Sequence, residues 1–130
     1  MRARGIDHVV LVVADAERSL AWYRDRLGLD PVRLEEWRRG EVPFVSVRLD
    51  ASTIIDLVEG PRRGDNVDHL CLLVEDADLG ALAADGAFEC EGPPRRLYGA
   101  RGVGWGIYVR DPDGNRIELR HYGEEPDAPA

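Results

Sequence analysis

The stretch IDHVVLVVAD at residues 6–15 decides the fold, because the chain repeats it as VDHLCLLVED at residues 67–76. Each copy opens with Asp-His and continues as a run of aliphatic residues, which is typical of a β-strand with at least one buried face. Each copy closes on an aspartate, Asp15 or Asp76, that is suited to cap a helix. The chain therefore predicts two copies of one module, each opening with a strand and a helix.

A carboxylate follows each copy at nearly the same distance. Asp56 stands 48 residues after His8, and Glu118 stands 49 residues after His69. Each of these acids lies between two aliphatic residues, as expected inside a strand. Each half of the chain therefore carries one strand histidine and one strand carboxylate.

The composition limits the class of protein. A chain of 130 residues, 44% of them hydrophobic, can form one compact domain or two small modules that share a core. The net charge of −8 argues against nucleic-acid binding, which depends on excess basic charge. All 17 basic residues are arginine, and the absence of lysine excludes Schiff-base catalysis and a P-loop phosphate site.

No segment of the sequence predicts a membrane or secretory role. The apolar runs are shorter than a membrane span requires, and the run after the N-terminal arginines resembles a short strand more than a signal peptide. Cys71 and Cys90 lack the spacing of a zinc knuckle or redox motif. We therefore expect a soluble cytoplasmic protein without a structural disulfide, in which Cys71 is a small buried residue or lies near a metal.

In the first half, the pattern predicts one helix and four strands. A strand at 6–13 leads to a helix that is capped by Asp15, runs to Leu27 and ends at Gly28. Three strands are expected after it, at 30–35, 42–49 and 53–58. This first module covers about residues 5–59, and the Pro, Gly and charged residues of 60–66 predict a linker.

The second half, at about residues 67–122, repeats this order. A strand at 67–74 leads to a short helix that is capped by Asp76 and ends at Gly86. The Asp-Pro-Asp-Gly turn at 111–114 predicts a final hairpin of strands 106–110 and 116–122. The acidic tail at 123–130 is expected to be disordered.

Together these elements predict an α+β fold of two paired βαβββ modules that form a cupped mixed sheet. A helix between two strands allows them to pair in parallel, and the remaining strands can form an antiparallel meander. One such module leaves a sheet face open, so two modules must pair, within one chain or between two chains. We expect a homodimer of single-domain chains.

The period of two along a strand predicts which side chains share a face. Asp56 then points away from Ile55 and Leu57, and Glu118 points away from its own aliphatic neighbours. Two imidazoles and two carboxylates in one cavity suit one divalent ion, namely Zn, Ni, Co, Mn or Fe. The alternative is that the histidines are ordinary polar residues and that Asp56 and Glu118 form salt bridges with arginines.

Three motifs resemble a known family. The segment YVRDPDGNRIE at 108–118 resembles the closing hairpin of the vicinal oxygen chelate superfamily, the group that includes glyoxalase I, extradiol dioxygenases and bleomycin-binding proteins. The opening IDHVVLVVAD and the segment WYRDRLGL at 22–29 fit the same pattern, so the resemblance covers residues 5–122.

The resemblance implies a set of site residues. His8, His69 and Glu118 match the three common metal-ligand positions of the family, and Asp56 matches the fourth position, where glyoxalase I usually carries Glu. The shorter Asp leaves open whether residue 56 binds the metal directly, binds it through water or acts only as a base. Tyr108 stands ten residues before Glu118, as the active-site Tyr of extradiol dioxygenases does, although a hairpin aromatic that only packs across strands would explain it equally.

The resemblance implies a metal-dependent enzyme on a small oxygenated substrate, of the glyoxalase-like lyase or isomerase type. The metal would chelate vicinal oxygens of the substrate, and Glu118 or Asp56 would move the proton. The resemblance also allows an extradiol-type dioxygenase, although His121 is the only further histidine and matches no catalytic position of that group. It allows, in addition, a thiol transferase acting on an antibiotic, or a metal-free protein that sequesters a small molecule or antibiotic.

Overall fold

The computed structural model divides the chain into two compact units, and the division falls between Gly64 and Asp65. It describes residues 2, 6–65, 67–75, 77–99 and 101–123. None of the helices in this described part is long and apolar enough to cross a membrane.

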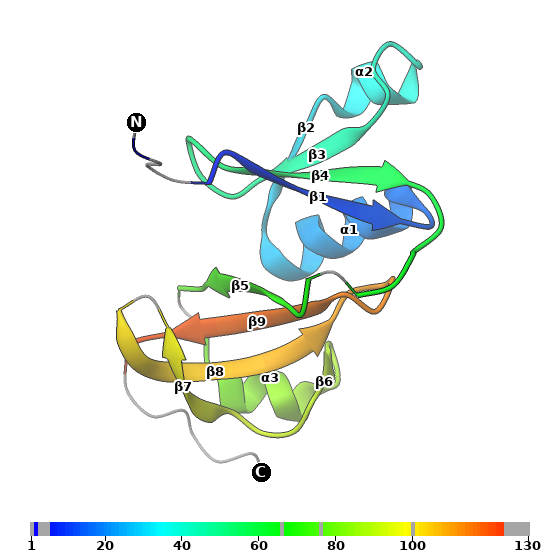
Figure 1. Cartoon of the computed structure of the whole chain (residues 1–130). Helices are drawn as coiled ribbons and strands as arrows, with labels where there is room; N and C mark the ends of the chain where they lie inside the picture. Colours follow the sequence, from blue (N-terminus) through cyan, green and yellow to red (C-terminus); the bar gives the residue numbers. More distant parts are fainter. Residues whose placement is uncertain (1, 3–5, 66, 76, 100, 124–130) are drawn as a thin grey trace. The chain divides into compact units, whose positions relative to one another are not determined.

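The first unit has the predicted βαβββ order with one extra helix (Figure 1). Its elements are β1 (His8–Val13), α1 (Ala16–Leu27), β2 (Asp30–Val32), α2 (Leu34–Arg38), β3 (Val45–Arg48) and β4 (Ile54–Glu59). The strands form one sheet in the order β1-β4-β3-β2. β1 and β4 are parallel, whereas β4, β3 and β2 form an antiparallel meander. The predicted βαβββ order of this module is confirmed, and the structure shows that the parallel partner of the first strand is the last one.

Helix α1 has both of the predicted caps. The Asp15 carboxylate accepts a hydrogen bond from the backbone N–H of Arg18, 3.0 Å away, and so satisfies a donor that has no partner inside the helix. Gly28 ends the helix with φ of 70°, a conformation that favours glycine. Leu20 and Tyr23 of α1 are fully buried, and Val13 of β1 contributes to the same core.

Two strand predictions in this module were too long. β2 ends at Val32 because Arg33 adopts a left-handed conformation (φ 62°), and the following residues Leu34–Arg38 are good helix formers that build α2. β3 begins only at Val45, because Pro43 has no backbone N–H to offer a sheet.

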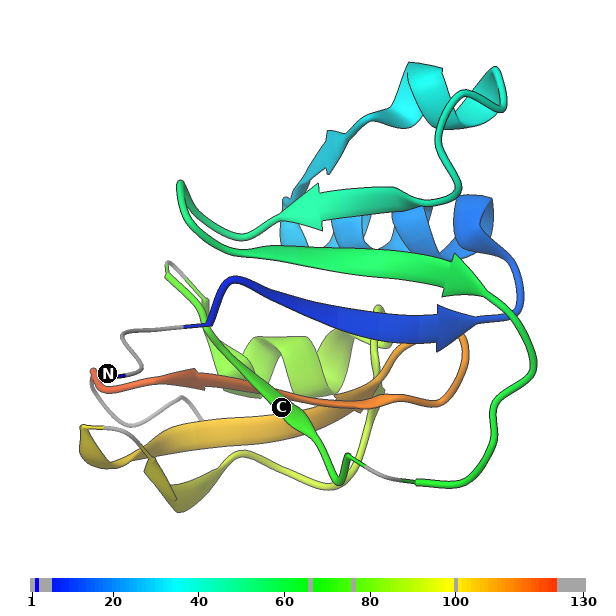
Figure 2. The ribbon, with the colours of Figure 1, turned by 45° about the horizontal axis from the view of Figure 1, so that its top comes forward.

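The second unit repeats the topology with a divided second strand (Figure 2). Its elements are β5 (Leu70–Leu73), α3 (Leu79–Asp85), β6 (Glu89–Cys90), β7 (Arg95–Gly99), β8 (Gly102–Arg110) and β9 (Arg116–His121). The sheet order is β5-β9-β8-β6, and β7 also pairs with β8. β5 is parallel to β9, as β1 is to β4, and the other pairings are antiparallel.

The divided strand was not predicted. β6 pairs with the C-terminal end of β8 and β7 with its N-terminal part, so both lie on the edge of β8 that faces away from β9. Gly92 has φ of 76°, and the two prolines that follow it cannot donate to a sheet. These three residues interrupt what would otherwise be one strand.

The helix and the hairpin of the second unit follow the prediction in part. The predicted cap Asp76 lies outside the described residues, and the structure places the N-cap of α3 at Asp78, whose carboxylate accepts from Ala81 N. Gly86 ends α3 in the left-handed conformation, as predicted. Asp111 holds the predicted turn, because its Oδ1 accepts from the backbone N–H groups of Asp113 and Asn115.

Candidate functional site

In the first module, His8 and Asp56 project from the same face of the sheet. Residues alternate along β1 and β4, and Val10 pairs with Asp56, two residues beyond His8. The opposite face carries Val13, Ile55 and Leu57, which are buried in the core with α1. The predicted alternation is therefore confirmed, and it directs both polar groups away from the helix.

Asp56 is buried, with 5% of its surface exposed. Ser46 lies directly across from it on β3, and the Ser46 hydroxyl donates a 2.6 Å hydrogen bond to Asp56 Oδ1. A buried carboxylate needs such a partner to offset the loss of hydration. The neutral hydroxyl holds one carboxylate oxygen, so the other oxygen is the one that can face a ligand.

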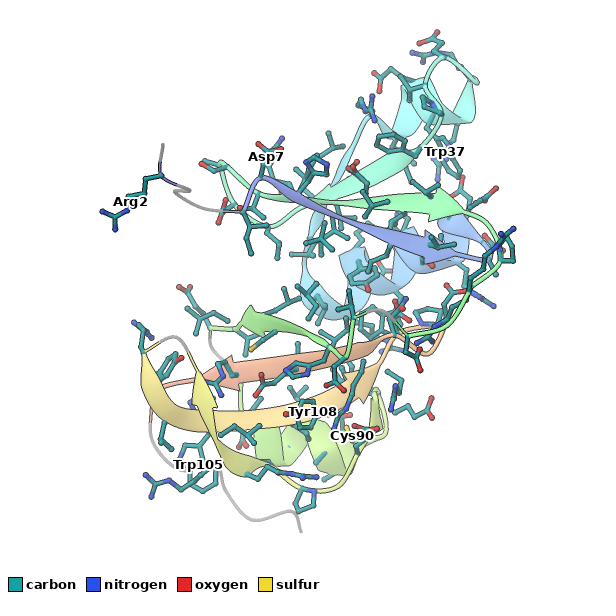
Figure 3. The ribbon with its side chains drawn as sticks, viewed as in Figure 1. Arg2, Asp7, Trp37, Cys90, Trp105 and Tyr108 are labelled. Atoms are coloured by element: carbon teal, nitrogen blue, oxygen red, sulfur yellow. The ribbon has the colours of Figure 1, made fainter. Side chains whose placement is uncertain are left out.

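The ring of His8 is oriented by the residue before it. Asp7, at the start of β1 (Figure 3), lies with its Oδ2 2.8 Å from His8 Nδ1. This hydrogen bond raises the pKa of His8, and the negative charge of Asp56 adds to the effect. Because Asp7 accepts from Nδ1–H, the neutral ring carries its lone pair on Nε2, the nitrogen that can bind a metal.

The second module repeats this arrangement, although β5 is shorter than the predicted strand at 67–74 and begins at Leu70, so His69 lies just before the strand and not within it. His69 Nδ1 lies 2.6 Å from Asp68 Oδ2, and His69 Nε2 lies 3.6 Å from Glu118 Oε2. The hydrogen bond from His69 lowers the pKa of Asp68, and the charge of Arg116 lowers it further. An imidazole nitrogen and a carboxylate oxygen are thus already close together within this module.

Glu118 is buried, with 4% of its surface exposed, and is held by a cation. Arg120 Nη2 donates a 3.2 Å hydrogen bond to Glu118 Oε1, while the same guanidinium also donates to Tyr122 Oη and to the backbone oxygen of Leu97. Space for the carboxylate comes from Gly106, where a Cβ atom would lie 2.8 Å from Glu118 Oε1. Arg120 therefore holds Oε1, and Oε2 is the oxygen on the side of His69.

Tyr108 lies beside this pair. It stands directly across from Glu118 in the β8–β9 ladder, and its ring meets the His69 ring edge-on with 5.3 Å between the centroids (Figure 3). The Arg116 guanidinium lies 3.8 Å from the Tyr108 ring centroid. The structure thus brings Tyr108, His69 and Glu118 together, as the site hypothesis requires.

Arg116 forms ion pairs with carboxylates of the second module. Its Nε lies 2.6 Å from Glu91 Oε2, and its Nη1 lies 3.1 Å from Asp68 Oδ2. Glu91 also binds Arg110. Glu91 was not predicted from the sequence, because this residue follows a two-residue strand that has no recognisable pattern.

Cys71 is exposed, not buried as one expectation had it, and it lies directly across from Glu118 in the β5–β9 ladder. Partial loss of hydration raises the pKa of Cys71 to about 12, and the hydrogen bond and the negative charge of Glu118 contribute. The thiol is therefore protonated at neutral pH and is not a nucleophile. Cys90 pairs with Val109 on the other face of the sheet, and both cysteines are free.

Two further residues lie away from the site. Trp105 and His121 pair with each other across β8 and β9, three positions along the ladder from the pair of Tyr108 and Glu118. The strand alternation places both on the face that packs on α3. Trp105 therefore belongs with the packing of that face, and His121 does not join His69.

The four expected ligands occur as two pairs, one in each module. No group of three or more His, Cys, Asp or Glu side chains able to hold a metal ion occurs among the residues that the structure describes. Each pair nevertheless has the chemistry that a divalent ion requires, with an imidazole Nε2 and a carboxylate oxygen that is held at its other atom.

Comparisons with known proteins find relatives that match most of this chain. A glyoxalase domain-containing protein of Mycosarcoma maydis is 32% identical over 129 residues, covering 94% of this chain and 70% of that protein. A virulence protein of Salmonella typhimurium is 31% identical over 122 residues, covering 90% of this chain and 83% of that protein. A V. cholerae integron cassette protein of known structure has 26% identity and a TM-score of 0.74, covering 95% of this chain and 98% of that one.

The family model described as the Glyoxalase/Bleomycin resistance protein/Dioxygenase superfamily matches residues 5–119. This range includes both modules and all four residues of the two pairs. The chain belongs to the Glyoxalase/Bleomycin resistance protein/Dioxygenase superfamily.

Proposed function

We propose that the protein is a divalent-metal-dependent enzyme of the glyoxalase-like lyase or isomerase type, acting on a small oxygenated substrate. His8, Asp56, His69 and Glu118 would hold one ion, which is Zn, Ni, Co, Mn or Fe. The ion, when bound, would act as a Lewis acid that stabilises negative charge developing on substrate oxygens.

One observation carries this proposal, the duplicated orientation of the histidines. In both modules the aspartate just before the histidine binds Nδ1, at 2.8 Å for His8 and 2.6 Å for His69. This contact fixes the tautomer and leaves Nε2 as the lone-pair nitrogen, as in many metal-binding histidines. Two exposed polar residues without a ligand would have no reason to repeat it.

The carboxylates of Asp56 and Glu118 would serve for metal binding and for proton transfer. Ser46 holds Oδ1 of Asp56, and Arg120 holds Oε1 of Glu118, so each group keeps one oxygen for a ligand. A carboxylate placed in this way can bind the ion and also take a proton from a carbon next to the substrate oxygens. Asp56 is the shorter group and has only a neutral partner in its hydrogen bond, so we assign the proton transfer to Asp56 and the firmer metal contact to Glu118.

The second candidate is an extradiol-type dioxygenase, and Tyr108 favours it. Its ring lies against His69 and across from Glu118, so its hydroxyl would act on a diol bound at this pair. Oxygen uptake with catechols in the presence of Fe(II) would support this reaction. Loss of the hemithioacetal formed from methylglyoxal and a thiol would support the lyase.

The metal content of the protein, measured by mass spectrometry, tests the proposal. We expect about one divalent ion per chain in the wild type, and a loss of most of it in His8→Ala, His69→Ala and Glu118→Ala. His121→Ala is the matched control and should keep its metal, because His121 faces α3. Equal losses in all four variants, or no metal after reconstitution with each ion, would contradict the site and favour a metal-free sequestration protein.

The proposal includes a homodimer in the cytoplasm. Each sheet has a helix of its own on one face only, and the pairing of such open faces is what a dimer would supply. The two free cysteines project from opposite faces of one sheet, so they are not placed to pair with each other. Sedimentation analysis of the purified protein tests the dimer.

A further inference from the structure

Arg95 lies on the same face of the second sheet as Glu118. It pairs with Gly106 across β7 and β8, and residues directly across a ladder project to one side. A Cβ atom at Gly106 would point at Glu118 Oε1, which identifies that side. The Arg95 guanidinium carbon accordingly lies 5.8 Å from the Tyr108 ring centroid.

Arg95 differs from the other arginines of this face because its hydrogen-bond acceptor is a backbone oxygen and not a carboxylate. Arg110 and Arg116 are paired with Glu91, and Arg120 is paired with Glu118. Arg95 Nη2 donates instead to the neutral backbone oxygen of Glu91, at 3.1 Å. Among the described residues, no carboxylate lies within salt-bridge distance of Arg95, and its side chain is exposed.

The guanidinium of Arg95 lies next to the candidate site, although the chain as a whole is strongly acidic. The net charge of −8 would repel an anionic ligand at long range, whereas an unpaired guanidinium beside Tyr108 attracts one locally. A guanidinium recognises a carboxylate or a phosphate through two parallel N–H donors. One edge of Arg95 is held by the backbone of Glu91, so the remaining N–H groups are positioned for a ligand.

We propose that Arg95 binds an anionic group of the substrate, a carboxylate or a phosphate, while Tyr108 flanks the ligand. The inference rests on the proposed function, because it places this group beside the oxygens that the ion would chelate. The substrate is then an acid with neighbouring oxygen substituents. Arg116 and Arg120, on the same face, are engaged by carboxylates of the protein itself.

The first test uses the metal-free full-length protein. Benzoate, phenyl phosphate and neutral benzyl alcohol are titrated into the wild type, Arg95→Met and Arg96→Met, and binding is followed by the NMR shifts of the Leu97 and Gly106 amides. Arg96 is the matched control, because it is also exposed and pairs with Trp105 on the opposite face. The ratio of the two anion affinities distinguishes a carboxylate from a phosphate ligand.

We expect the wild type and Arg96→Met to bind the preferred anion about tenfold more tightly than benzyl alcohol, as one charged hydrogen-bonding contact allows. In Arg95→Met this preference should fall below about twofold, at the level of one weak contact. A preference that survives in Arg95→Met, or is absent from the wild type, overturns the proposal.

The second test separates this inference from the proposed function. Metal-loaded wild type, Arg95→Met and Arg96→Met are titrated calorimetrically with catechol and with 3,4-dihydroxybenzoate, which adds only a carboxylate. Arg95→Met should retain its metal and its affinity for catechol but lose the preference for the acid, whereas a preference kept in Arg95→Met counts against Arg95. If the wild type takes up no metal, the proposed function fails, and the metal-free titration still decides the role of Arg95.

Discussion

In the first module the carboxylate of Asp56 is held by the neutral hydroxyl of Ser46, whereas in the second module Glu118 is held by the guanidinium of Arg120. Both acids are buried and both face away from the module's helix. The difference begins with side-chain length, because the longer Glu118 occupies the space that Gly106 leaves free. Asp56 needs no such space and is reached by a short hydroxyl.

The surroundings of the two acids also differ, because more charged and polar groups lie around Glu118 than around Asp56. Glu118 is close to His69, Tyr108 and Cys71, and arginines lie around them. Asp56 has Val10 and Ser46 as its direct neighbours across the sheet. Under the proposed function, both modules would supply metal ligands, and only the second would supply groups that recognise a substrate.

The largest expected effect comes from removing the charge of Glu118. Glu118→Gln takes away the carboxylate that binds the guanidinium of Arg120, which is itself buried at 3% exposure, and should lower the free energy of unfolding by about 3 kcal/mol. Asp56→Asn keeps an oxygen for the Ser46 hydroxyl and should cost about 1 kcal/mol. Urea denaturation of the metal-free proteins measures both values.

The double variant Glu118→Gln/Arg120→Met is the control for this comparison. It removes the buried cation together with its counter-charge, so it should recover part of the stability that Glu118→Gln loses. If Asp56→Asn costs as much as Glu118→Gln, the two acids do not differ in the way that the contacts indicate.

Substitutions of two glycines of β8 should have different effects on stability and on metal affinity. A Cβ atom at Gly104 would lie 2.6 Å from the backbone oxygen of His121, which cannot move aside cheaply, so Gly104→Ala should cost about 2 kcal/mol. The Cβ atom of Gly106→Ala would meet the movable end of Glu118, and this variant should lose metal affinity more than stability. Thermal unfolding and metal titration of both variants check this, and the reverse order would show that Glu118 is not held against Gly106.

The ion pairs of Glu91 with Arg110 and Arg116 should stabilise the second module in a pH-dependent way. Hydrogen bonds from Arg116 and Arg110 lower the pKa of Glu91 below 4.5, so its contribution is present above pH 4.5 and is lost as the pH falls through the lowered pKa. Glu91→Gln should cost about 1 kcal/mol at pH 7.

Stability curves at pH 7 and pH 3 provide the measurement, because the difference between wild type and Glu91→Gln should shrink at the lower pH. Glu89→Gln, an exposed position on β6, serves as the control and should change little at either pH. A pH-independent loss in Glu91→Gln would assign its effect to packing.

The smallest effect is expected at the exposed ion pair of the first module. Arg38 of α2 binds both carboxylate oxygens of Glu17 on α1, at 2.8 and 2.9 Å, but both side chains are largely exposed to solvent. Water and salt screen such a pair, so Glu17→Gln should leave the melting temperature unchanged within error. A clear drop would show that charge pairing also contributes to the first module.

Local signals predicted most of the elements. Asp15 and Gly28 bound α1 as expected, and the strand alternation placed Asp56 and Glu118 on the faces where the structure has them. These features depend on near neighbours in the chain, namely caps, left-handed glycines and the period of two. The errors occurred where one residue changed the local geometry, as Arg33 does before α2 and as Gly92 does between β6 and β7.

The sequence by itself determined the duplication, the βαβββ order of each module, and the presence of one histidine and one acid in each half. The tertiary structure alone decided which arginines are neutralised, because Glu91, Arg116 and Asp68 are far apart in the chain and meet only in the folded sheet. It likewise decided that Arg95 lies beside Tyr108 without a carboxylate partner among the described residues. Strand register sets these contacts, and register depends on pairing between distant segments that no local pattern specifies.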